Sequence, residues 1–217
     1  MANKSLKRGI FITVDGPEGC GKSTHSKLLY EYLKKHSYDC VRTREPGGTM
    51  LGENIRNILL HCEDVDISDL AELFLFEAAR SQIVNEIIVP ALKKKKIVIC
   101  DRFSDATFSY QGFGGKIPLK TIAALDRVAT AGLKPDLTIL LDIDTLKGLR
   151  RAKSKGVDRM EKKDIAYHKR VRGGYLKLAK EEPKRIRVIK VVGEIEDTQR
   201  KVRLGAERVI QRYKRSR

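Results

Sequence analysis

The sequence predicts an α/β fold in which helices cover a five-stranded parallel sheet. Short apolar runs rich in Val and Ile alternate with longer segments whose apolar residues recur at helical spacing. This alternation is typical of βαβ units, and the first apolar run leads directly into a glycine-rich turn. We expect strands at 9–15, 39–44, 96–101, 136–142 and 187–192. We expect helices near 23–36, 50–61, 68–93, 118–131, 144–153, 164–181 and 196–213.

Composition favours one domain, 1–217, because 217 residues with 41% hydrophobic residues can build one substantial core. No apolar stretch approaches transmembrane length, and no signal-peptide core follows the basic residues near the N-terminus. The four cysteines form no C-x-x-C pair, which is typical of reduced thiols. We therefore expect a cytoplasmic protein without a membrane partner.

The net charge of +17 suits either a nucleic acid or an anionic nucleotide as partner. Much of this charge lies in runs such as 93–96 and 212–217, which usually form solvated surface. The chain carries no aromatic RNA-binding signature, zinc-finger spacing or basic-zipper heptad. We expect no specific nucleic acid partner, and keep a nucleotide-dependent nucleic-acid-binding module as the alternative from another class.

A phosphate-binding loop follows the first strand. Residues 16–23 read G-x-x-x-x-G-K-S, with the required strand before them and a helical pattern after them. The glycines let backbone N–H groups surround a phosphate, Lys22 reaches the β- and γ-phosphates, and the Ser23 hydroxyl can bind Mg²⁺. A helix starting at about Ser23 adds its positive dipole end. The pattern predicts a nucleoside triphosphate site in a P-loop NTPase-like three-layer sandwich, with a coincidental turn as the alternative.

The carboxyl ends of the other strands carry further candidates, because ligands of parallel sheets bind beyond these ends. Asp101 ends one strand, where a carboxylate can hold Mg²⁺ directly or through water; a turn aspartate is the alternative. Arg102 beside it is suited to grip a second phosphate. A GTP-binding switch is disfavoured, because the chain has no N-K-x-D sequence. The strand-end rule singles out the loop after Val14, residues 44–48, residues 101–103 and the region after Leu141.

The segment 150–159 interleaves cations with small residues. This composition suits a short lid that closes over phosphates and excludes water, so we expect a lid insert at about 150–160. A solvated basic helix end is the alternative.

At these motifs the chain resembles the thymidylate kinase family of nucleoside monophosphate kinases over essentially its whole length, and the bacterial-type members with a basic lid in particular. Two elements, Glu-Pro-Gly-Gly-Thr at 45–49 and Tyr-Gln-Gly at 110–112, are specific to this family among monophosphate kinases. The other shared motifs are Val14-Asp15-Gly16, Phe76 with Arg80, Asp101-Arg102-Phe103, Lys134-Pro135-Asp136 and Asp158-Arg159-Met160-Glu161.

The resemblance implies phosphorylation of dTMP to dTDP with ATP and Mg²⁺, in dTTP biosynthesis, by a homodimer. A kinase with another monophosphate acceptor is the alternative in the same class. Helical spacing alone would make Phe76 a core residue, whereas the resemblance makes it the side chain that stacks on thymine. It also implies that Arg80 donates to O4, that Thr107 and Gln111 meet the N3 edge, and that Tyr110 crowds the sugar 2′ position.

The same resemblance assigns the phosphate and metal contacts. Arg56 and Arg102 hold the acceptor phosphate, while Glu18 contacts the sugar 3′-hydroxyl and nearby metal water. Ser23 and Asp101 serve the metal. The implied ATP-binding residues are Gly16, Pro17, Glu18, Gly19, Cys20, Gly21, Lys22, Ser23 and Thr24. The implied catalytic residues are Lys22, Arg102, Arg151, Lys153 and Lys155.

The chain departs from the family at the lid. Members without a phosphate-loop arginine usually carry arginines at the positions of Lys153 and Lys155, and lysine is a flexible point charge rather than a planar fork. The variable positions of this phosphate loop hold no arginine. We therefore expect Arg151, Lys153 or Lys155 to neutralise the charge on the transferred phosphoryl group.

Lys153→Ala is expected to lower kcat by roughly ten- to a thousandfold with dTMP affinity nearly intact, because a positioned cation acts mainly in the transition state. Lys153→Arg should retain activity, since the guanidinium fork can contact two phosphate oxygens. Steady-state kinetics of single alanine variants at 151, 153, 155 and 159 measure these effects. Wild-type kcat in all four would mean that the segment is only a solvated loop.

Overall fold

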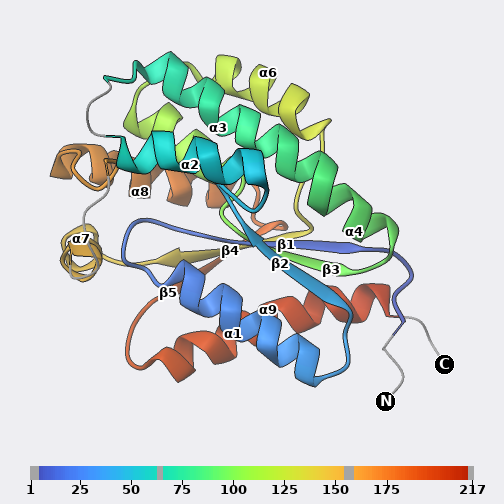
Figure 1. Ribbon diagram of the computed structural model, residues 1–217. Coiled ribbons are helices and arrows are strands. Elements are labelled where there is room, and N and C mark those ends of the chain that lie inside the picture. The colour runs from blue at the N-terminus through green and yellow to red at the C-terminus, as the bar shows by residue number, and fades with distance from the viewer. Residues whose placement is uncertain (1–4, 63–65, 154–158, 215–217) are drawn as a thin grey trace.

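The computed structural model describes residues 5–62, 66–153 and 159–214. One five-stranded sheet with the order β2-β3-β1-β4-β5 forms its centre (Figure 1). All neighbouring strands run parallel, which confirms the predicted fold class. The five predicted strands are present, with small shifts at their ends. They are β1 (Ile10–Asp15), β2 (Cys40–Arg44), β3 (Ile97–Asp101), β4 (Leu137–Asp142) and β5 (Ile186–Lys190).

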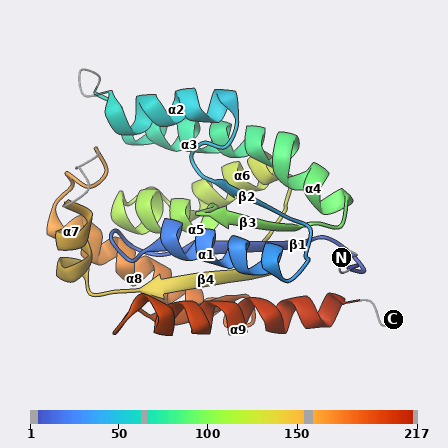
Figure 2. The same ribbon diagram turned by 60° about the horizontal axis from the view of Figure 1, so that its bottom comes forward.

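Helices cover both faces of the sheet and complete three layers (Figures 1 and 2). On one face, α1 (Lys22–Lys35) packs beside α9 (Ile195–Tyr213). In residues 5–62, 66–153 and 159–214, no helix is both long enough and apolar enough to cross a bilayer. The other face carries α2 (Met50–His61), α3 (Asp69–Ile83), α6 (Leu119–Thr130) and α8 (Ile165–Glu181), while α7 (Thr145–Lys153) lies past the end of β4.

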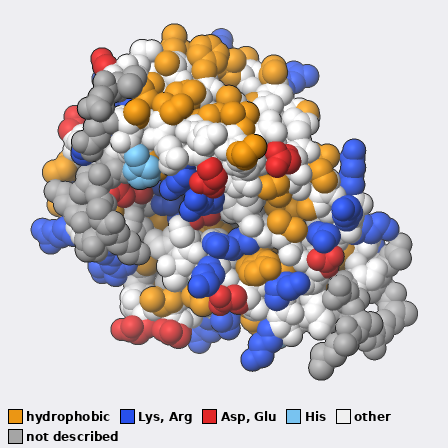
Figure 3. Space-filling model, viewed as in Figure 1, with side chains coloured by type: hydrophobic (Ala, Val, Ile, Leu, Met, Phe, Trp, Pro, Cys, Tyr) orange, Lys and Arg blue, Asp and Glu red, His pale blue; other side chains and the backbone are white. Residues whose placement is uncertain are grey.

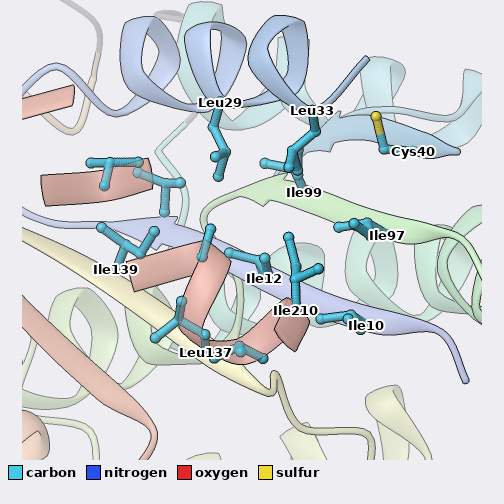
Figure 4. Close-up of a cluster of buried hydrophobic side chains, with 14 of the residues drawn as sticks. Ile10, Ile12, Leu29, Leu33, Cys40, Ile97, Ile99, Leu137, Ile139 and Ile210 are labelled. Atoms are coloured by element: carbon cyan, nitrogen blue, oxygen red, sulfur yellow. The ribbon is translucent and has the colours of Figure 1, made fainter. Parts of the chain in front are cut away.

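The central strands are buried on both sides, because alternate residues point to opposite faces. Ile12 of β1 and Ile99 of β3 belong to a cluster with Leu29 of α1 and Ile210 of α9 (Figure 4). Phe11, the next residue along β1, belongs to a separate cluster on the opposite face. Burial on both faces explains why these strands are continuous apolar runs in the sequence.

The predicted helix at 68–93 is one helical stretch with a wide turn inside it. α3 leads into the π-helical turn η1 (Val84–Ile88), which leads into α4 (Val89–Lys93). Pro90 lies in the first turn of α4 and has no N–H to donate to the turn before it. The wide turn sits immediately before this missing hydrogen bond.

A second helical stretch is absent from the sequence prediction. It consists of α5 (Ser104–Thr107) and the π-helical η2 (Phe108–Gly114), and its glycines lower its helix propensity. Packing against α8 stabilises it instead: a Cβ on Gly114 would lie only 2.7 Å from Tyr167 Cε2. Tyr167 also donates a hydrogen bond of 3.1 Å from its hydroxyl to the Tyr110 carbonyl. This stretch carries three of the predicted nucleotide contacts.

Candidate active site

A cavity of about 1010 Å³ lies at the carboxyl edge of the sheet. The register pairs Val14 of β1 with Asp101 of β3, and Asp101 with Arg44 of β2, so the segments after these strands start side by side. Gly16 and Pro17 belong to the phosphate loop but not to the cavity lining. The predicted residues that line the cavity are Glu18, Gly19, Cys20, Gly21, Lys22, Ser23, Thr24, Arg56, Phe76, Arg80, Asp101, Arg102, Thr107, Tyr110, Gln111 and Arg151.

The phosphate loop has the conformation that its glycines allow. Gly16, Gly19 and Gly21 have φ values of 145°, 66° and 93°, which residues other than glycine rarely adopt. α1 begins directly afterwards at Lys22, so its N-terminal N–H groups face the loop. The Lys22 ammonium donates a hydrogen bond of 2.9 Å to the Pro17 carbonyl and lies inside the loop.

Two glycines dock α7 against the phosphate loop. A Cβ on Gly19 would lie 2.0 Å from the Gly148 carbonyl oxygen, and a Cβ on Gly148 would lie 2.3 Å from the Glu18 carbonyl oxygen. Only glycine at both positions permits this approach. The contact brings the helix that carries Arg151 and Lys153 to the phosphate-binding end of the cavity.

The two predicted metal ligands lie in direct contact. The Ser23 hydroxyl donates a hydrogen bond of 2.5 Å to Asp101 Oδ2, and Asp101 is buried at the end of β3. A hydroxyl and a carboxylate are hard oxygen donors of the kind that Mg²⁺ prefers. Within the described residues no group of three or more His, Cys, Asp or Glu side chains is arranged to hold a metal. The pair therefore fits a Mg²⁺ ion, which would take its remaining ligands from water and triphosphate oxygens.

Arg102 is the centre of a buried hydrogen-bond network. Its φ of 70° is unusual for a residue with a side chain, and such backbone strain often accompanies function. Nη2 donates to Glu18 Oε1 at 2.8 Å and to the Tyr110 hydroxyl at 3.0 Å, while Nη1 donates to the Tyr175 hydroxyl at 3.2 Å. The Tyr110 hydroxyl in turn donates to Glu18 at 2.6 Å. These partners hold the guanidinium in one orientation.

Glu18 is ionised by its cationic neighbours. Burial alone would raise the pKa of its carboxyl, but Arg102 and Lys22, together with the Tyr110 hydrogen bond, outweigh burial and lower the pKa to about 2. The Glu18 carboxylate thus forms ion pairs with both Lys22 of the phosphate loop and Arg102. Arg56 lines the same end and donates a hydrogen bond of 2.9 Å to the Pro46 carbonyl.

The other end of the cavity holds the predicted base-reading residues. Arg80 is almost fully buried, with 2% exposure, and contacts three carboxylates. Its Nε donates to Glu45 at 2.9 Å, and its Nη1 donates to Glu77 at 2.7 Å and to Asp126 at 3.4 Å. Burial raises the pKa of Glu45 to about 7, although the nearby Arg80 opposes the shift. The hydrogen bonds to the three carboxyl groups fix the direction of the Arg80 guanidinium at the cavity wall.

A family model described as "Thymidylate kinase" matches residues 14–202. The chain belongs to the thymidylate kinase family. A thymidylate kinase of Dehalococcoides mccartyi is 49% identical over 176 residues, 81% of this chain and 85% of that protein. One from Desulfosudis oleivorans is 43% identical over 208 residues, 92% of this chain and 97% of that protein. The crystal structure of thymidylate kinase from Ehrlichia chaffeensis superposes with a TM-score of 0.76 at 36% identity, covering 91% of this chain and 98% of that one.

Membership of the thymidylate kinase family makes the protein an enzyme, a nucleoside monophosphate kinase whose reaction is the phosphorylation of dTMP to dTDP. The resemblance inferred from the motifs is thereby confirmed. The family also implies that ATP is the phosphoryl donor.

The predicted lid cations are only partly described. Arg151 is exposed and lines the cavity. Lys153 is the last residue of α7, and Lys155 lies outside the described residues. Where the described chain resumes, Arg159 binds α2 and α3: its Nε donates to the Leu59 carbonyl at 2.8 Å and its Nη2 contacts Glu72.

Several residues of the site have no motif in the sequence. Tyr175 of α8 places its hydroxyl 3.2 Å from Arg102 and 3.2 Å from Asp15 Oδ1. Gly148 and Glu72 likewise belong to no motif that the sequence analysis identified. The turn after β5 also lines the cavity beside the phosphate loop. The strand-end rule would have found this turn, because it applies to the fifth strand as well as to the other four. The lining residues of this turn are Val191, Gly193 and Glu194, while Ile195 and Thr198 line the cavity from the start of α9.

The ionised Glu18 should make folding stability depend on pH. Its pKa in the folded protein is about 2, below the usual 4.5, so its contribution is present above pH 4.5 and is lost as the pH falls from 4.5 toward 2. Urea unfolding between pH 6 and pH 3 should therefore show a steeper loss of stability in the wild type than in Glu18→Gln. The two curves should run parallel above pH 5.5. Parallel curves over the whole range would contradict this account of the carboxyl.

Proposed function

We propose that this cavity performs the phosphorylation of dTMP with ATP and Mg²⁺, with the donor triphosphate at the phosphate loop and the acceptor between Arg102 and Arg80. One observation carries the proposal: a single cavity is lined at one end by the phosphate loop with Lys22 and at the other by a buried, fixed guanidinium beside Gln111. Such a cavity suits two ligands that share a phosphate-binding centre.

The arrangement supports catalysis by positioning and charge. Phosphoryl transfer needs two anions brought into line and little covalent help from the protein. The loop amides and Lys22 hold the donor, and Arg56 and Arg102 hold the acceptor phosphate. A bound Mg²⁺ would supply charge neutralisation at Ser23 and Asp101. The docking of α7 on the loop supports roles for Arg151, Lys153 or Lys155 at the transferred group.

The base end supports recognition of a pyrimidine. Phe76 is half-buried on the wall and can stack on the ring. Arg80 offers a donor, while Thr107 and Gln111, both nearly fully buried, offer polar atoms to the ring edge. The hydrogen bond to Glu18 fixes Tyr110 in the cavity wall, which supports a role for its ring against the sugar of the acceptor. A cytoplasmic location is also proposed, supported by four cysteines that are all free thiols.

Lys22→Ala is expected to reduce dTDP formation by roughly a hundredfold or more, because a fixed cation is lost from the transferring phosphates. A coupled assay measures ADP release in the presence of ATP and Mg²⁺, with dTMP, dCMP, dGMP or dAMP as the acceptor in turn. We expect dTMP to be the preferred acceptor. Lys27→Ala is the matched control, since Lys27 is an exposed lysine on the same helix. Unchanged turnover in a folded Lys22→Ala protein would refute the assignment of the loop.

A homodimer is proposed through the outer face of α2, α3 and α6. Figure 3 shows hydrophobic side chains gathered along the side of the molecule where Figure 1 draws these helices. Exposed apolar residues of this extent are typical of an interface between proteins. The exposed members of this face are Met50, Leu51, Ile58, Leu70, Phe74 and Val128.

Phe74→Glu should convert the dimer to a monomer, because Phe74 is 55% exposed on α3 of this face and a charge cannot be buried there without a partner. Sedimentation equilibrium measures the mass. Leu204→Glu is the control, since Leu204 is similarly exposed but lies on α9, across the sheet. A monomeric wild-type protein, or a dimeric Phe74→Glu variant, would contradict the proposed interface.

A further inference from the structure

We propose that Glu72 is a positioning residue that decides which end of the Gln111 amide faces the nucleobase. Glu72 thereby makes the acceptor site select a base that carries a hydrogen on N3. The inference rests on the proposed placement of the dTMP base beside Arg80 and Gln111. It concerns α3 and η2, which no sequence motif connects.

The geometry leaves the Gln111 amide one orientation. Its Nε2 donates a hydrogen bond of 2.9 Å to Glu72 Oε1, and both side chains are 3% exposed. An ionised carboxylate only accepts hydrogen bonds, so the amide must present its NH₂ group to Glu72. The reversed amide would set its carbonyl oxygen against the carboxylate in a buried site, which is costly. Gln111 lines the cavity, and its carbonyl oxygen is the end turned away from Glu72.

Arg159 contacts the other oxygen of the Glu72 carboxylate. Its Nη2 contacts Glu72 Oε2, while its Nε donates to the Leu59 carbonyl at 2.8 Å. Both hydrogen bonds converge on Glu72, because the guanidinium and the amide each donate into its carboxylate. The Gln111 carbonyl oxygen is therefore the end of the amide left to face the base.

This orientation of the Gln111 amide matches thymine and opposes cytosine. Thymine presents a donor at N3 and an acceptor at O4, and cytosine presents an acceptor at N3 and a donor at the 4-amino group. The Gln111 oxygen accepts from the thymine N3–H, and Arg80 donates to O4. Cytosine would place like groups opposite both side chains, and a site built for one pattern rejects the other strongly.

Glu72→Gln tests the proposal, because the new amide has only one acceptor end. The charged Arg159 takes that oxygen in preference to a neutral amide, so the new NH₂ group faces Gln111 and turns its amide over. We expect kcat/KM for dTMP to fall by roughly ten- to a hundredfold, and the dTMP-to-dCMP ratio of kcat/KM to fall at least about tenfold. KM for ATP should stay unchanged.

Glu86→Gln is the matched control. Glu86 accepts a hydrogen bond of 2.8 Å from Gln82 Nε2, the same pair of groups, but it is exposed and outside the cavity lining. The dTMP-to-dCMP ratio should not change in this variant.

Arg159→Ala separates orientation from mere stability. Alone it leaves the Glu72–Gln111 hydrogen bond in place, so the dTMP-to-dCMP ratio should stay within about twofold of the wild type, whatever happens to kcat. Combined with Glu72→Gln, it releases the new amide oxygen to accept from Gln111, so the ratio should recover.

A folded Glu72→Gln protein with the wild-type ratio would overturn the proposal, as would a double variant that remains unselective. If Glu72→Gln alone fails to fold, the double variant decides. A wild-type protein that does not phosphorylate dTMP would refute the proposed function instead.

Discussion

The parallel pairing of β1 with β3 is the constraint on which the site depends. Because Val14 and Asp101 lie at the same level, the phosphate loop and Asp101-Arg102 leave the sheet side by side. The contact between Ser23 and Asp101 and the contact between Glu18 and Arg102 both follow from this register. A slip of one residue would turn Asp101 to the opposite face of the sheet and break the first of these contacts. The central position of both strands, buried on both faces, protects the register.

Buried carboxylates then fix two arginines that line the cavity, Arg102 and Arg80. Glu18 holds Arg102, and three carboxylates including Glu45 hold Arg80. A free arginine side chain would lose conformational entropy on binding a ligand, whereas these two have already lost it during folding. Burial of the charges costs stability, and the hydrogen bonds among the partners offset part of that cost. The site is thereby ordered before a nucleotide arrives, which is the condition for electrostatic catalysis.

Local patterns predicted what local sequence controls. The strands, the phosphate loop and the helices beside them are all visible as apolar periodicity and as the glycine spacing of residues 16–23. The sequence did not predict the helical stretch at 104–114, because its glycines argue against a helix. Tertiary contacts with α8 stabilise it, namely the packing against Gly114 and the hydrogen bond from Tyr167 to the Tyr110 carbonyl. Glu72 and Gly148 could not be found either, since each acts through a residue far away in the chain. The folded structure alone brings such pairs together.

Charge varies along the cavity in a way that supports the proposed orientation of the acceptor. Around Arg80, three carboxyl groups bind one guanidinium, and burial raises the pKa of two of them, Glu45 and Glu77, so the Arg80 charge is already compensated within the protein. At the other end Lys22, Arg56 and Arg102 line the cavity together, and Arg102 and Lys22 lower the pKa of Glu18 to about 2 against the effect of its burial. A nucleotide with its phosphate toward Arg80 would therefore gain less electrostatic attraction than one with its phosphate toward Lys22, Arg56 and Arg102. This difference supports the proposed orientation of the acceptor, with its base toward Gln111 and its phosphate toward the donor.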